Sequence, residues 1–376
     1  MKTSITLSAS ALQHNFREAK RSALTARVSP VVKANAYGHG LEQVVSALRR
    51  EDVPFFSIDS VEELERIRAV SPHIPVLLLG RIPDDQFARA IALDTAFVVS
   101  SIEHVRMLET LTLNTPARVH IELETGLYRF GADDTKLAEL LAWLLAHPSL
   151  ATVEGVCTHL STAEDVASDV FVREQEACFR RGVERIELAG FHPLYRHVAC
   201  SAALWLHPFT CFDVIRFGIS LYGVWSSSEV AREMTHQRKD ISLLPVLTWK
   251  TYVGEIKTVP RGATIGYGRT HVADHDMRIA VLPIGYADGF VRRLSSCGEV
   301  LIRGKRARVV GRVCMNICMV DVTTIHDVAY GDEVVIFGRQ GEEVLGPEAW
   351  DDVSSSSLIV YEALACLRES IPRTLV

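Results

Sequence analysis

The ten residues from Val31 to Gly40, VVKANAYGHG, combine a single lysine with polar and glycine neighbours. Two β-branched apolar residues precede Lys33, as in a buried strand that ends at a polar loop. Lysine is rarely buried without a partner, because its ammonium group would lose strongly held water. A lysine in this position either extends to solvent or uses its amine, and a Schiff base with an aldehyde is one such use.

This stretch resembles the cofactor-lysine signature of the alanine racemase family, and further matches continue to Tyr361 near the C-terminus. The resemblance implies a (β/α)8 barrel followed by a β-rich domain, with pyridoxal 5'-phosphate bound to Lys33. It also implies that the protein interconverts L-alanine and D-alanine, of which D-alanine is a cell-wall precursor. The same resemblance implies a homodimer whose active sites are shared between the two subunits. A serine or broad-specificity racemase and a non-catalytic pyridoxal-phosphate carrier with a single barrel remain alternatives. Related decarboxylases would need an acidic residue where this chain has Arg216.

By the same resemblance, the barrel supplies most of the groups that bind the cofactor. Arg216, in DVIRFGISLYG, would face the pyridine nitrogen and leave it unprotonated, because a guanidinium does not release its proton. A weaker electron sink favours racemisation over transamination. Considered alone, Arg216 is more typical of a surface ion pair, and His159 in GVCTHLSTAED of a core side chain. The resemblance assigns His159 to the ring and a further set to the phosphate: Tyr37, Ser201, Gly218, Ile219 and Tyr361.

Arg129, in ELETGLYRFGAD, would contact the cofactor's phenolic oxygen and the substrate carboxylate, and its planar fork of donors suits both. Seven residues earlier the family usually has a carbamylated lysine that orients this arginine, whereas this chain has Glu122. Glutamate supplies a carboxylate without carbamylation. Its side chain is shorter, so a water molecule or a shifted Arg129 would replace the direct contact.

The second catalytic base is expected in the C-terminal part of the chain. By the resemblance, Tyr267 in ATIGYGRTH takes the face opposite Lys33, since inversion at Cα needs acid/base groups on both faces. Considered alone, its two flanking glycines indicate only a hairpin turn. Tyr286, in LPIGYADG, would narrow the entrance, and the backbone N–H of Met315 would meet the substrate carboxylate. Asn316 stands where the family usually has aspartate, which removes one negative charge.

Alternating strand-like and helical segments are expected to position these residues. Amphipathic segments such as 41–50, 61–70 and 135–146 lie between most of the apolar runs. The pattern predicts a (β/α)8 barrel over residues 10–228, with its chemistry at the carboxyl ends of the strands. After a polar segment, an antiparallel β-rich domain is predicted at 240–376, with residues 1–9 as a candidate additional strand. Eight barrel strands are predicted, at 31–34, 55–58, 76–79, 97–99, 119–123, 153–159, 197–200 and 214–217.

Composition limits the classes of function. The 376 residues are 48% hydrophobic and 23% charged, as in ordinary globular proteins of two or three domains. A net charge of -6 argues against a nucleic-acid partner. The chain has no run typical of a signal peptide or a membrane span, so we expect a cytoplasmic protein without a membrane partner. Eight scattered cysteines indicate reduced thiols, and no metal site is expected.

Overall fold

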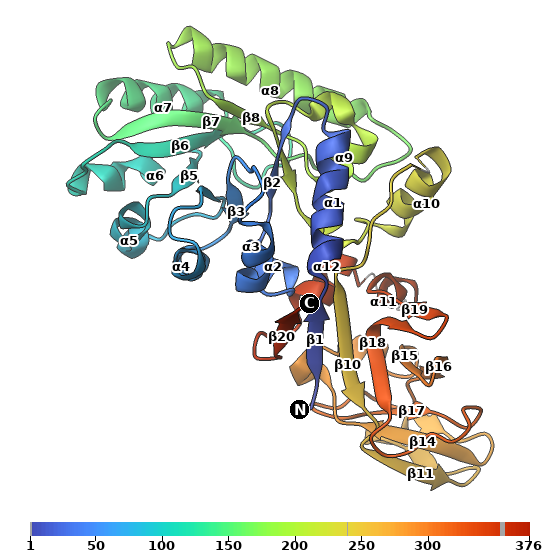
Figure 1. Ribbon diagram of the computed structural model, residues 1–376. Coiled ribbons are helices and arrows are strands. Elements are labelled where there is room, and N and C mark those ends of the chain that lie inside the picture. Colours follow the sequence, from blue (N-terminus) through green and yellow to red (C-terminus); the bar gives the residue numbers. More distant parts are fainter. Residues whose placement is uncertain (1, 239, 354–357) are drawn as a thin grey trace.

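The computed structural model describes residues 2–238, 240–353 and 358–376 and has two lobes (Figure 1). The N-terminal lobe is built from short parallel strands with helices packed around them. Its strands are β2 (Arg27–Pro30), β3 (Phe56–Ile58), β4 (Val76–Leu78), β5 (Ala96–Val99), β6 (Ala117–Glu122), β7 (Ala151–Cys157), β8 (Tyr195–His197) and β9 (Val214–Phe217). Its α-helices are α1 (Ala9–Ser22), α2 (Lys33–Tyr37), α3 (Leu41–Leu48), α4 (Val61–Val70), α5 (Phe87–Ala92), α6 (Glu103–Arg106), α7 (Asp134–Ala146), α8 (Val170–Leu188), α9 (Ser201–Leu206) and α10 (Ser228–Gln237).

The eight parallel strands curl into the barrel that the sequence predicts. Strands β3 to β8 form one sheet in chain order, and β2 pairs with β9. The two groups are joined by a parallel bridge between Val31 and Ser57, and by the N–H of Arg216, which donates to the carbonyl of Ala199 at 3.0 Å. Because all strands run in one direction, their carboxyl ends meet at one mouth of the barrel.

The predicted first strand at 31–34 is wrong in position. Strand β2 ends at Pro30, and Lys33 begins the short helix α2. Residues 34–37 all have positive φ, between 51° and 54°, so the chain makes a left-handed turn directly after the lysine. Such backbone costs about 1–2 kcal/mol for each residue that has a Cβ, and local propensity alone does not predict it. Strands β7 and β8 also end earlier than predicted, so His159 and Ser201 follow their strands.

The C-terminal lobe is antiparallel except for one edge pair. Strand β1 (Ser4–Leu7) pairs antiparallel with β10 (Leu247–Tyr252) and parallel with β20 (Arg373–Leu375), so both chain ends lie in this lobe. The same sheet contains β15 (Glu299–Ile302), β16 (Lys305–Arg308), β18 (Glu333–Gln340) and β19 (Glu343–Leu345). A second sheet contains β11 (Glu255–Val259), β14 (Met277–Leu282) and β17 (Cys318–Asp321), and a small hairpin contains β12 (Thr264–Ile265) and β13 (His271–Val272).

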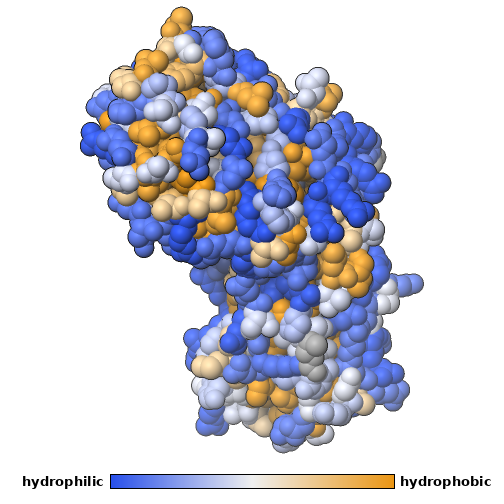
Figure 2. Space-filling model, turned by 60° about the vertical axis from the view of Figure 1, so that its left-hand side comes forward, coloured by the Kyte–Doolittle hydropathy of each residue, from blue (hydrophilic) through white to orange (hydrophobic). Residues whose placement is uncertain are grey.

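The C-terminal segment of the chain contacts both lobes. Helix α12 (Val360–Ala365), which follows α11 (Glu348–Val353), packs against the left-handed turn, and a Cβ on Gly38 would lie 2.0 Å from the Leu364 carbonyl oxygen. Arg373 donates from Nε to the Gly38 carbonyl at 2.8 Å. Hydrophobic patches interrupt the hydrophilic surface of both lobes (Figure 2). Within the described residues, no helix is long and apolar enough to cross a membrane.

Candidate functional site

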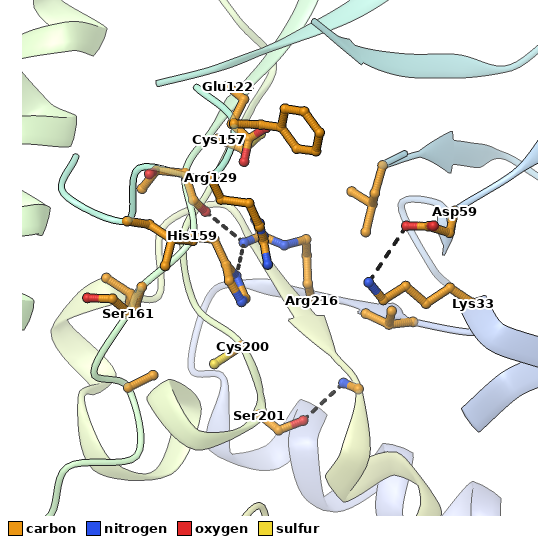
Figure 3. Close-up of a pocket in the computed structure, with 18 of the residues that line it drawn as sticks. Lys33, Asp59, Glu122, Arg129, Cys157, His159, Ser161, Cys200, Ser201 and Arg216 are labelled. Atoms are coloured by element: carbon orange, nitrogen blue, oxygen red, sulfur yellow. Dashed lines mark hydrogen bonds and ion pairs between the residues drawn. The ribbon is translucent and has the colours of Figure 1, made fainter. Parts of the chain in front are cut away.

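A cavity of about 800 Å³ lies at the mouth of the barrel. It is formed by residues at or just after the carboxyl ends of the strands (Figure 3). One side chain from α12 also lines it. Every barrel residue singled out from the sequence lines it, together with Tyr361 of α12: Lys33, Tyr37, Glu122, Arg129, His159, Ser201, Arg216, Gly218 and Ile219. These residues span most of the chain, and the fold brings them into one cavity.

The Lys33 amine reaches this cavity and is not sealed in the core. Its Nζ lies 3.7 Å from Oδ1 of Asp59, and its side chain is 39% exposed (Figure 3). Behind this pair, the Glu63 carboxylate accepts the backbone N–H of Asn35 at 3.1 Å and that of Asp59 at 3.0 Å. Burial raises the pKa of Glu63. Glu63 therefore joins the left-handed turn to the loop after β3, a role that the sequence did not indicate.

Arg216 is almost fully buried and its guanidinium is fixed by surrounding acceptors. Its Nη1 donates to Nδ1 of His197 at 2.6 Å and to the His197 carbonyl at 2.8 Å. Its Nη2 lies 2.7 Å from the Thr158 carbonyl and 3.3 Å from Nδ1 of His159. Burial, and then the Arg216 charge, lower the pKa of His159 to about 3, so both histidines are neutral acceptors. The Nε–H of Arg216 has no acceptor among the described residues and is the donor left for a ligand.

The part of the cavity around Ser201 and Gly218 offers hydrogen-bond donors for an anion. Ser201 Oγ accepts the Gly218 N–H at 3.0 Å, which leaves the hydroxyl proton of Ser201 available. Ile219 begins the 3-10 helix η4 (Ile219–Tyr222), and the N–H of a first helical residue has no acceptor within its helix. A Cβ on Gly218 would lie 2.9 Å from the Tyr37 hydroxyl oxygen, so only glycine leaves this space open. Burial raises the pKa of Tyr37, which keeps its hydroxyl a donor.

Tyr361 closes this side of the cavity from the C-terminal lobe. Its hydroxyl donates to Oε1 of Glu164 at 3.0 Å, and burial raises the pKa of that carboxyl group. The family resemblance assigned Tyr361 to the site, but Glu164, five residues after His159 in the STAED segment, was not predicted. Its position one loop beyond a strand end was the available signal.

Glu122, the last residue of β6, lines the cavity beside Cys157 (Figure 3). Burial raises the pKa of Glu122, while the charges of Arg216 and Arg129 oppose that rise. Among the described residues, no hydrogen bond or ion pair joins Glu122 to Arg129, and the Arg129 side chain is exposed. The direct orienting contact is therefore not formed within one chain, and the role predicted for Glu122 stays a prediction.

The residues predicted in the C-terminal lobe lie in a different place. Tyr267, Tyr286 and Met315 line a second hollow, of about 930 Å³, that shares no lining residue with the barrel cavity. They are exposed by 71%, 43% and 58%, respectively. Asn316 and the cationic side chains Arg292 and Arg312 lie in the same hollow. One chain thus does not bring Tyr267 to Lys33.

Comparisons with known proteins place both lobes in one family. The family model for the alanine racemase N-terminal domain matches residues 7–226, and that for the alanine racemase C-terminal domain matches residues 246–375. Alanine racemase 2 of Caldanaerobacter subterraneus subsp. tengcongensis is 36% identical over 376 residues, covering 99% of this chain and 94% of the relative. Alanine racemase of Leptospira interrogans is 35% identical, covering 96% and 92%.

Solved structures give the same result for the whole fold. The alanine racemase from a D-cycloserine-producing Streptomyces lavendulae has a TM-score of 0.91 at 28% identity, covering 100% of this chain and 97% of the other. The alanine racemase from Bacillus anthracis with bound L-Ala-P has a TM-score of 0.91 at 29% identity, covering 100% and 95%. The likeness therefore extends over both lobes and their relative placement.

Proposed function

The chain belongs to the alanine racemase family, and on that premise we propose that it interconverts L- and D-alanine with Lys33 and Tyr267 as the two bases. The observation that carries this proposal is the barrel cavity, which is lined by a lysine amine, a fixed arginine and a set of donors suited to an anion. Family membership gives the reaction, and the cavity supports the assignment of its residues.

Pyridoxal 5'-phosphate is the cofactor of this family, and the groups in the cavity fit it. The Tyr37 and Ser201 hydroxyls and the Ile219 N–H suit a phosphate dianion, which needs several hydrogen bonds. The free Nε–H of Arg216 is a donor suited to an unprotonated pyridine nitrogen. The cofactor forms a covalent bond to an amine and, when bound, withdraws electrons from Cα of the amino acid. Lys33 supplies the only lysine amine among the residues that line the cavity.

The residues of this chain then have distinct tasks. Lys33 removes or returns the Cα proton on one face, and Tyr267 of the partner subunit does so on the other. Arg129 holds the substrate carboxylate, aided by the backbone N–H of Met315 of the partner subunit. Arg216 would hold the ring nitrogen without giving it a proton, so the cofactor would withdraw less charge from Cα, which favours proton exchange over transamination.

We also propose a homodimer in which each C-terminal lobe covers the other chain's barrel mouth. Tyr267 is 71% exposed and the hollow around it is separate from Lys33, so a second copy is needed to complete a site. The neighbouring Met315 and Ile317 are exposed by 58% and 45%, which suits a face that becomes buried on association. Two-fold closure would create two equivalent sites.

The relatives are named for alanine, and no observation favours serine, broad specificity or a carrier without turnover. Tyr361 narrows the cavity from α12, which suits a substrate with a methyl side chain. We place the protein in the cytoplasm, in keeping with its eight free cysteines.

The test is an incubation of purified protein and cofactor with a panel of L-amino acids, followed by chiral chromatography. We expect D-alanine as the main product and the reverse reaction from D-alanine. D-serine formed faster than D-alanine would overturn the substrate assignment, and absence of any D-product would overturn the activity.

A further inference from the structure

A line of buried polar side chains leaves the cavity through the interior of the barrel. From Arg216, Nη1 contacts Nδ1 of His197 at 2.6 Å, and Nε2 of His197 lies 2.8 Å from Nδ1 of His120. Nε2 of His120 then lies 3.2 Å from Oε2 of Glu154. Both imidazoles have no exposed surface, whereas the Glu154 side chain is 20% exposed. The line therefore runs from the site to a carboxylate that touches solvent.

The two ends of this line permit one arrangement of protons. The guanidinium is only a donor, so Nδ1 of His197 must accept and its proton must sit on Nε2. That proton leaves Nδ1 of His120 as the acceptor, and His120 then donates from Nε2 to Glu154. Burial lowers the pKa of both histidines, which keeps them neutral and allows each only one ring proton. Each link thus fixes the tautomer of the next.

The barrel is built to aim Glu154 at His120. Strands β6 and β7 are in register at Val119 and Val153, but the next pair is His120 with Gly155, so Glu154 is an extra residue in β7. Such a bulge redirects a side chain. Gly155 leaves the space for the imidazole, because a Cβ there would lie 2.3 Å from Nδ1 of His120.

Apolar packing isolates the line from water. Phe55 lies edge-on to both imidazoles, with ring centroids 5.5 Å from His120 and 5.7 Å from His197. Beyond the bulge, Arg118 contacts Glu154 at 3.4 Å and Asp94 at 2.9 Å. In a medium of low polarity, a carboxylate at one end strengthens every donor in the series.

We propose that Glu154 is a positioning residue that acts through His120 and His197 to hold Arg216 in place against the cofactor ring. Glu154 accepts the last proton of the line and gives the buried guanidinium a distant counter-charge, so Arg216 keeps one orientation during turnover. The consequence is control of reaction specificity from a residue that touches neither substrate nor cofactor. The inference deepens the proposed function and rests on it for the activity readout, while its NMR readout is independent of activity.

The first test is nitrogen NMR of holoenzyme labelled with 15N-histidine, with the His120 signals identified by their loss in His120→Gln. In the wild type, we expect both histidines as neutral Nε2–H tautomers. In Glu154→Ala, the Nε2–H of His120 loses its acceptor, so its proton signal should move upfield, whereas the donor at the Arg216 end still holds both tautomers. Glu154→Gln should restore the wild-type pattern, because its amide oxygen still accepts the His120 proton.

The second test is kinetic. In Glu154→Ala we expect kcat to fall about tenfold, the lower end for loss of an orienting partner, with KM within about twofold. The side reaction, in which alanine leaves as pyruvate and the cofactor is retained in its amine form, should rise about tenfold per turnover. Glu154→Gln should stay within about threefold of the wild type in both measures.

Asp213→Ala is the matched control. Asp213 is also a partly buried barrel carboxylate and pairs with Arg196 at 2.8 Å, but it lies outside the line. It should alter neither the His120 Nε2–H signal nor the pyruvate yield. A Glu154→Ala enzyme with a wild-type His120 Nε2–H signal and an unchanged ratio of pyruvate to D-alanine would overturn the proposal. Loss of all racemisation in the wild type would contradict the proposed function but leave the NMR result intact.

Discussion

The barrel cavity and the hollow in the C-terminal lobe differ in how far one chain orders their groups. In the cavity, Arg216 is 7% exposed and its guanidinium is held by histidines and carbonyls. In the hollow, Tyr267 is 71% exposed, and no hydrogen bond to its hydroxyl is formed within the described residues. The cofactor side is thus ordered by intrachain bonds, whereas the opposite catalytic face depends on a second copy. Substitutions in the cavity and in the hollow should therefore impair activity in different ways.

The largest effect is expected at Lys33, on the ordered side. Lys33→Ala removes both the amine that bonds the cofactor and one catalytic base, so activity should fall about a thousandfold or more. Borohydride treatment of the wild type should fix the cofactor to the peptide that contains Lys33. Lys250→Ala is the control, since Lys250 of β10 pairs with Glu333 of β18 and lies outside the cavity. Label recovered on Lys250 or Lys257 would refute the assignment.

Tyr267→Ala tests the partner-dependent side, and a loss of about a hundredfold or more is expected. Mixing this variant with Lys33→Ala should restore activity, because a mixed dimer holds one site with both bases and one with neither. With free exchange at equal concentrations, roughly half the dimers are mixed, so roughly a quarter of wild-type activity should return. Native mass spectrometry would count the mixed dimers. If these form and activity does not rise above the separate variants, both bases come from one chain.

The sequence predicted the barrel because its signals are local, whereas the candidate cavity residues other than Lys33 came from the family resemblance. Alternating apolar runs and amphipathic helices need no knowledge of distant contacts, and the Lys33 motif spans ten residues. The left-handed turn after Lys33 was missed because its stability comes from Glu63 and from α12, far away in the chain. The pairs Tyr361–Glu164 and His120–Glu154 were missed for the same reason. The second pair also depends on a bulge that alternation does not reveal.

Arg216→Glu is expected to reduce the rate of racemisation about a hundredfold and to increase transamination. A carboxyl group lets the ring nitrogen take a proton, so pyruvate and a new long-wavelength absorbance should appear. The melting temperature should also fall, because the carbonyls of His197 and Thr158 lose their donor. Arg216→Lys keeps a cationic donor and is the control for charge. Simple inactivity, with normal cofactor content and no new absorbance, would favour a structural role.

The smallest effect on turnover is expected at Glu122, which lines the same cavity as the exposed Arg129. Glu122→Gln should lower kcat about tenfold in both directions if the carboxylate steadies Arg129. Activity should not depend on dissolved CO₂, since no carbamate has to form. Wild-type kinetics in both directions would show that Glu122 is only a charge at a strand end.

The same variant should become more stable as activity falls. Burial raises the pKa of Glu122 above the ordinary value of 4.5, so the folded state binds its proton more tightly than the unfolded state does. As pH rises above about 4.5, keeping the buried group ionised costs the wild type stability, and glutamine removes that cost. The melting temperature of Glu122→Gln should therefore exceed that of the wild type at pH 8, with little difference near pH 4. A variant that is less stable than the wild type at pH 8 would show that the two arginines more than offset the burial of the carboxylate.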